Sequence, residues 1–114
     1  MKVFCHHLYE LKKGLRNLVL CTEKRGNREQ IERRLVNERI PYVVHEIGKD
    51  HINVYFGKQA CVDVVRTFTT KKLSELSDEQ DFMLGVMLGY DRLQQCERYL
   101  ERRSRRDGID DLIG

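Results

Sequence analysis

A chain of 114 residues suits one compact domain, because a second hydrophobic core would have too few residues to form. Hydrophobic residues make up 40% and charged residues 34%, with a single proline, which excludes a disordered chain and favours a globular one. The 21 Lys and Arg residues are nearly balanced by 18 Asp and Glu, so a net charge of +3 argues against a dedicated nucleic-acid-binding protein.

Residues 2–8 alternate along the chain and predict a first strand. Phe4, His6 and Leu8 would lie on one face, and Val3, Cys5 and His7 on the other. Gly14 marks a turn, and residues 16–22 predict a second strand.

Asn27 and Gln30 have the spacing of a helix N-cap and its capping-box partner, which predicts a helix over residues 27–38. Pro41 follows this helix and cannot continue it. The segments "PYVVHEI" and "HINVYF", separated by "GKD", predict a β-hairpin with a tight turn.

The segment from Gly57 to Phe68 has apolar residues at helical spacing and predicts a second helix. Ser77, followed by acidic residues, is typical of a helix N-terminus and predicts a long helix over about residues 78–104.

This order of elements predicts an α+β fold: a two-layer sandwich with a four-stranded antiparallel sheet, ferredoxin-like or permuted, and two helices on one face. We expect a single domain over residues 1–105 that ends in the long helix, and a short tail over residues 106–114. No segment approaches the roughly 20 apolar residues of a membrane span, and no apolar signal-peptide core is present, so a cytoplasmic protein without a membrane partner is expected.

Two candidate sites involve cysteine. Thiolate and imidazole groups are the ligands that zinc or iron prefers, so one hypothesis is a metal site formed by Cys5, His7, Cys21 and His45. The alternative is that these are buried thiols and histidines at a strand edge, because the spacing matches no zinc-binding pattern and no cofactor is expected. Cys61, near a helix N-terminus and Lys58, is the reactive-thiol candidate, with ordinary packing as the alternative.

The predicted long helix has an apolar stripe that needs a partner. The residues of this stripe are spaced three and four positions apart, which places them on one side of the helix. Gly85 and Gly89 would allow the backbone of a second helix to approach closely. The stripe predicts a homodimer, with packing against the chain's own sheet as the alternative; its residues are Phe82, Gly85, Val86, Gly89, Leu93 and Cys96.

Five arginines gather at the end of the same helix. They would form either a solvated helix end or a surface for RNA or an acidic partner. The residues are Arg98, Arg102, Arg103, Arg105 and Arg106.

Three segments together resemble a family of small, uncharacterised bacterial proteins found largely in anaerobes: "MKVFCHHLYELKKGLRNLVLCT", "IPYVVHEI…NVYFG" and "LSDEQDFMLGVMLGYDRLQQCERYL". The resemblance spans Met1 to about Leu100, and "FMLGVMLGYDRLQQCERY" is its most specific part. It implies no assigned activity and no catalytic residues, and at most a flavodoxin-type redox protein as partner. The sequence therefore predicts a non-enzymatic regulatory or partner-binding module that self-associates. The alternative is a metal- or thiol-dependent redox accessory protein that uses Cys5, His7 and Cys21.

Overall fold

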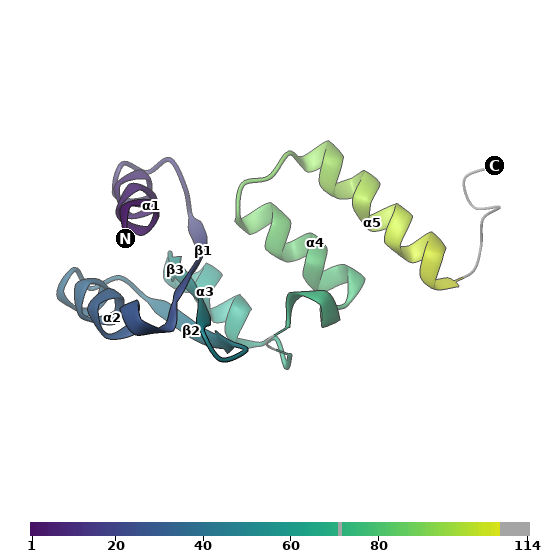
Figure 1. Cartoon of the computed structure of the whole chain (residues 1–114). Coiled ribbons are helices and arrows are strands. Elements are labelled where there is room, and N and C mark those ends of the chain that lie inside the picture. The colour runs from purple at the N-terminus through teal and green to yellow at the C-terminus, as the bar shows by residue number, and fades with distance from the viewer. Residues whose placement is uncertain (71, 108–114) are drawn as a thin grey trace.

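The protein is an α+β fold in three layers (Figure 1). The computed structural model describes residues 1–70 and 72–107. These residues form a three-stranded sheet, two short 3₁₀ turns and five α-helices. In chain order the elements are α1 (Lys2–Lys12), β1 (Leu18–Lys24), η1 (Arg25–Asn27), α2 (Arg28–Asn37), β2 (Tyr42–Ile47), β3 (His51–Gly57), α3 (Gln59–Arg66), η2 (Leu73–Glu75), α4 (Asp78–Met87) and α5 (Arg92–Asp107).

The sheet is antiparallel with the strand order β1-β3-β2, so β3 lies in the centre and β1 and β2 form the two edges. Leu18 pairs with Gly57, and Tyr42 pairs with Phe56. The predicted β-hairpin is confirmed as β2 and β3, and its turn contains Gly48 with a φ of 58°. The second predicted strand is confirmed as β1.

Helices α1 and α2 cover one face of the sheet. Phe4 and Leu8 of α1 and Ile31 and Leu35 of α2 are buried against alternate residues of the strands. The Phe4 and Phe56 rings pack with their centroids 5.4 Å apart. This core joins the first third of the chain to the central strand.

A second core lies on the opposite face, beneath α3 and α4. Val62 and Val65 of α3 and Leu84 and Leu88 of the α4 segment pack with Leu18 and Tyr55. Figure 1 shows the sheet between α1 and α2 on one side and α4 and α5 on the other. The two cores thus place the α4–α5 pair on the face away from α1.

The prediction of a strand over residues 2–8 is wrong, since this segment lies within α1. Phe4 and Leu8 are separated by one helical turn, and the partly buried Leu11 continues the same side. An alternating strand and a short amphipathic helix both accommodate this pattern, and burial against α2 and the sheet selects the helix. The four-stranded, ferredoxin-like sheet is therefore wrong as well: the sheet has three strands, and helices cover both faces.

The helix over residues 27–38 is confirmed as α2, but Asn27 makes no side-chain capping hydrogen bond, so the predicted capping box is not formed there. The helix predicted from Gly57 is confirmed as α3. The predicted long C-terminal helix is present, but the segment is divided into α4 and α5, and α5 extends to Asp107. The rest of the predicted tail, residues 108–114, lies outside the described residues. None of the helices in the described ranges has the length and apolar character to cross a bilayer.

Candidate interaction surfaces on the α4–α5 hairpin

Local sequence signals explain why the chain turns back between α4 and α5. The Ser77 hydroxyl accepts a hydrogen bond from the Gln80 backbone N–H, and the Gln80 side chain accepts one from the Ser77 N–H, so the N-cap predicted at Ser77 is confirmed and forms a capping box with Gln80. At the other end Gly89 has a φ of 85°, and the Tyr90 N–H donates to the Gly85 carbonyl over 3.0 Å. This is a Schellman motif, in which glycine ends a helix. Asp91 then caps α5 by accepting from the Gln94 N–H at 3.0 Å.

Arginines of α5 bind the acidic first turn of α4 and hold the two helices together. Arg98 donates to both carboxylate oxygens of Asp81, at 2.8 and 3.0 Å, and this contact raises the pKa of Arg98. Arg102 bonds Asp78 at 3.1 Å, Asp81 at 2.9 Å and the Leu76 carbonyl at 3.0 Å. Antiparallel packing therefore brings the acidic side chains at the start of α4 next to the basic side chains at the end of α5. Each set of charges is also favoured by the dipole of its own helix.

The remaining arginines of the predicted basic patch are also paired. Arg103 contacts Glu79 at 3.4 Å, and Arg106 contacts Asp78 at 3.2 Å. Arg105 bonds Glu101 on its own helix. All five arginines thus have acidic partners within the chain, which leaves less positive charge available to RNA or to an acidic partner than the sequence alone indicates.

The outer side of the hairpin carries an apolar groove of about 580 Å³. The Phe82 and Tyr99 rings meet edge to face, 5.8 Å apart, and the Tyr99 hydroxyl donates to Glu79 at 2.9 Å. The other residues of the groove are Met83, Cys96 and Leu100, and Met83 and Leu100 are exposed to 40% and 61%. We call these residues the outer groove.

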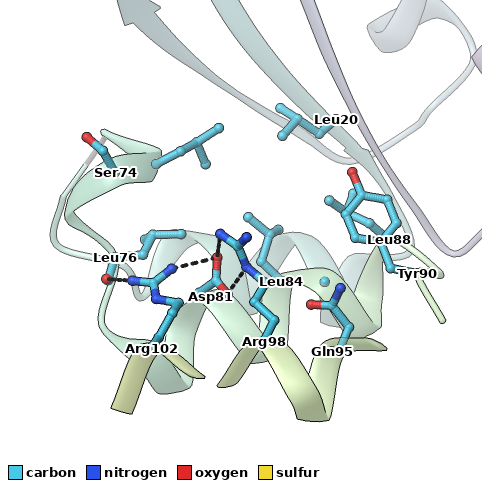
Figure 2. Close-up of a pocket in the computed structure, with 12 residues that line it drawn as sticks. Leu20, Ser74, Leu76, Asp81, Leu84, Leu88, Tyr90, Gln95, Arg98 and Arg102 are labelled. Atoms are coloured by element: carbon cyan, nitrogen blue, oxygen red, sulfur yellow. Dashed lines mark hydrogen bonds and ion pairs between the residues drawn. The ribbon is translucent and has the colours of Figure 1, made fainter. Parts of the chain in front are cut away.

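A second hollow lies on the inner side, between the hairpin and β1, and has a volume of about 420 Å³ (Figure 2). Its apolar lining includes Leu20 of β1 together with Leu76, Leu84 and Leu88. The polar side chains shown around it include Gln95 and Arg98, both from α5. We call this hollow the inner cleft.

The predicted self-association stripe is divided between these two sides. Phe82 and Cys96 line the outer groove, and helical spacing continues their faces to Val86 and Leu93, which are exposed to 42% and 68%. Gly85 instead lies on the inner side, where an added Cβ would come within 2.0 Å of the Gln95 Oε1 atom. Gly89 forms the turn. The glycines therefore serve contacts within the chain, and four apolar residues of the stripe face outward.

The predicted metal ligands do not come together. Cys5 is exposed on α1, whereas Cys21 is buried in the core beneath it. His7 lies 3.2 Å from Arg16 and 3.4 Å from Glu10. His45 stacks edge to face on Tyr55, on the opposite face of the sheet from Cys21. Across residues 1–70 and 72–107, no three His, Cys, Asp or Glu side chains are close enough to bind a metal ion.

The four thiols are free and differ in their surroundings. Burial raises the pKa of Cys21 to about 12, and the neighbouring Glu23 carboxylate, 3.6 Å from the sulfur, adds to this effect. Cys61, the predicted reactive thiol, is partly buried against the core under α3. Only Cys5 and Cys96 are exposed.

Sequence reasoning missed Asp91 and Gln95. The order Gly89, Tyr90, Asp91 is a signal for one helix to end and another to begin, because glycine is favoured just after a helix and aspartate just before one. Gln95 carries no such signal, since a glutamine in a polar helix is ordinarily exposed.

Comparison with family models matches residues 2–102 to a family described as "Protein of unknown function (DUF2023)". A search of curated proteins found no match to this chain.

Proposed function

Because the chain belongs to this family of unknown function, we propose from its own surfaces that the protein is a non-enzymatic, partner-binding module that self-associates through the outer groove. The observation that carries this proposal is the groove itself, which stays open to solvent after α4 and α5 have packed together. Apolar side chains exposed side by side on neighbouring helices commonly mark a protein interface.

A second copy suits the shape and chemistry of this surface. Two helical hairpins that pack face to face form a four-helix bundle, whose core consists of apolar residues at such spacings. That core would consist of five apolar residues from each copy: Phe82, Met83, Val86, Leu93 and Leu100. In a symmetric dimer the same surface of each copy contacts its counterpart, so the surface has to be complementary only to itself.

The test compares two exposed apolar residues with nearly equal exposure. Leu100 lies in the outer groove and is 61% exposed, and Val36 lies on α2, outside the groove, and is 60% exposed. We expect wild-type protein and Val36→Glu to form a dimer in light scattering and native mass spectrometry, and Leu100→Glu to be monomeric, because a buried unpaired carboxylate opposes association. A monomeric wild type at micromolar concentration, or a dimer that persists in Leu100→Glu, would exclude this interface.

A further inference from the structure

The excess positive charge of the protein lies at α1 and α2, away from the α4–α5 hairpin. Two hollows of about 550 and 340 Å³ meet there at Lys12, near the end of α1. The larger hollow lies along α1 beside α2, and the smaller one lies between the end of α1, the loop before β2 and the turn from β3 to α3. We call the two hollows together the basic groove. Its cationic residues are Lys12, Lys13, Arg34, Arg39 and Lys58.

Among the residues that the structure describes, none that lines the basic groove is acidic. Glu38, which does not line it, pairs with Lys12 at 2.5 Å and with Arg34. Five cations and this one carboxylate leave a net charge of +4 here, whereas the whole chain carries +3. The rest of the chain is therefore slightly acidic in sum, and the positive charge belongs to one surface.

Three of the five cations have no carboxylate partner within the described part of the chain. Lys13 lies over the Tyr9 ring, with its Nζ atom 5.4 Å from the ring centroid. Arg39 and Lys58 are exposed, and Arg39 keeps a φ of 58°, a conformation that disfavours any residue with a Cβ. The arginines of α5, in contrast, all have acidic partners within the chain. The protein thus neutralises its C-terminal cations and leaves those of the basic groove available.

The groove combines this charge with an apolar floor. The floor residues are Leu8, Leu11, Ile40 and Pro41. An apolar centre with a polar rim is the usual arrangement of a protein interface, and tyrosine and arginine are enriched there. Tyr9 is 57% exposed and lies at the groove with Arg34. A surface for single-stranded nucleic acid instead needs aromatic faces on which bases stack, and Lys13 already lies over the Tyr9 ring.

We propose that the basic groove binds an acidic segment of a partner protein. Carboxylates of the segment pair with Arg39 and Lys58, and an aliphatic side chain between them packs on Leu11 and Ile40. Opposite charges across such an interface increase the rate of association and select the partner, and the apolar contact adds affinity.

This inference goes beyond self-association, because it uses a different part of the molecule. Figure 1 shows α1 and α2 on the other side of the sheet from α4 and α5, which form the outer groove. Leu100→Glu, which tests the outer groove, should therefore leave binding at the basic groove unchanged. Each proposal can fail without the other.

The test uses three peptides of equal length that are blocked at both ends. Glu-Asp-Leu-Glu-Asp-Leu-Glu has carboxylates and leucines, Gln-Asn-Leu-Gln-Asn-Leu-Gln has no charge, and Glu-Asp-Ser-Glu-Asp-Ser-Glu has no leucine. Each peptide is titrated into ¹⁵N-labelled full-length protein, and the backbone amides of α1 and of residues 57–59 are followed by NMR. We expect the acidic leucine peptide to shift these signals in the micromolar range, the acidic serine peptide to bind more weakly, and the neutral peptide not to bind.

The double variant Arg39→Gln/Lys58→Gln removes two cations that have no carboxylate partner in the described part of the chain. We expect it to bind the acidic leucine peptide about tenfold more weakly at low salt, with a smaller difference from the wild type as salt is added, because salt screens exposed charges. Lys24→Gln/Lys49→Gln is the matched control: it removes the same charge from exposed positions at the opposite end of β3 from Lys58. The control should bind as the wild type does.

Several results would overturn the proposal. These are the absence of binding by the acidic leucine peptide, equal weakening in the two double variants, or equal binding of the serine peptide, which would indicate attraction by charge alone. Tighter binding of an oligothymidylate or of inorganic phosphate in the same titration would instead assign the groove to nucleic acid or to a small anion.

Discussion

Replacement of Arg102 by methionine should strongly destabilise the α4–α5 hairpin. The Asp78 carboxylate is only 2% exposed, and its two cationic partners are Arg102 at 3.1 Å and Arg106 at 3.2 Å. Arg102 also bonds Asp81 and the Leu76 carbonyl, so one substitution removes three polar contacts that join α5 to the start of α4. Methionine keeps most of the hydrocarbon stem and isolates the loss of the guanidinium.

The magnitude follows from the partner that remains. Removal of one member of a fully buried ion pair costs roughly 3–5 kcal/mol. Arg106 still neutralises Asp78, and Arg102 is itself 20% exposed, so we expect a loss of about 2–3 kcal/mol in the free energy of unfolding. Urea unfolding measures this loss as a lower midpoint at an unchanged slope. The free energy of unfolding of Arg102→Lys should lie between those of the wild type and Arg102→Met, because an ammonium keeps the charge but not the planar set of donors.

Arg105→Met is the matched control. Arg105 pairs with Glu101 on its own helix, and the two side chains are 73% and 63% exposed, so its removal should cost about 0.5 kcal/mol or less. Equal losses for Arg102→Met and Arg105→Met would refute the conclusion that buried arginine contacts hold the hairpin together. A double-mutant cycle with Asp78→Asn separates the contact with Asp78 from the other two.

Three further predictions concern single positions. Gly57→Ala should lower the free energy of unfolding by more than about 1 kcal/mol, because φ is 152° and the new Cβ would lie 2.3 Å from the Asn17 carbonyl oxygen; Gly26→Ala, with no atom within 4 Å, is the control in the same urea assay, and equal effects would contradict this account. Arg39→Gly should raise the free energy of unfolding by about 0.5–1 kcal/mol, because Arg39 has a φ of 58° just after α2, where glycine is favoured. A lower midpoint of thermal unfolding in this variant would show that the arginine side chain stabilises the fold by more than the backbone strain destabilises it. At pH 8, Cys21 should react with iodoacetamide far more slowly than the exposed Cys96. The pKa of Cys21 in the folded protein is about 12, above the ordinary value of 9.0, so the free energy of unfolding should fall as the pH rises from 9 towards 12. Cys21→Ala should reduce that fall.

The strands and the helices of the middle of the chain could be predicted because several local signals agree there. Residues 42–56 combine β-branched and aromatic residues with a turn that contains Gly48, and the structure confirms the hairpin. Ser77 and the acidic residues that follow it similarly predict the start of α4 from local signals alone. Such elements depend on neighbours in sequence, so one sequence is sufficient to find them.

The first segment shows where local patterns are insufficient. Over seven residues, the polarity of residues 2–8 fits both a strand and a helix, and the choice depends on what Phe4 and Leu8 contact. They contact Ile31, Leu35 and the central strand, all distant in sequence. The metal hypothesis depends on a strand that places Cys5 next to β1. In the structure Cys5 instead lies exposed on the outside of α1, so the predicted ligands are not adjacent.

The hairpin could have been predicted more fully from charge. An acidic group at residues 78–81 and a basic group at residues 98–106 lie on either side of Gly89, and an antiparallel turn at that glycine brings them together. This pairing accounts for the arginines without a nucleic acid, and it leaves the apolar residues of both helices to face outward or towards β1. The burial of Gln95 has no counterpart in any sequence pattern, because it depends on the space at Gly85 and on the approach of the hairpin to Leu20. The position of Gln95 is thus a feature that only the folded arrangement reveals.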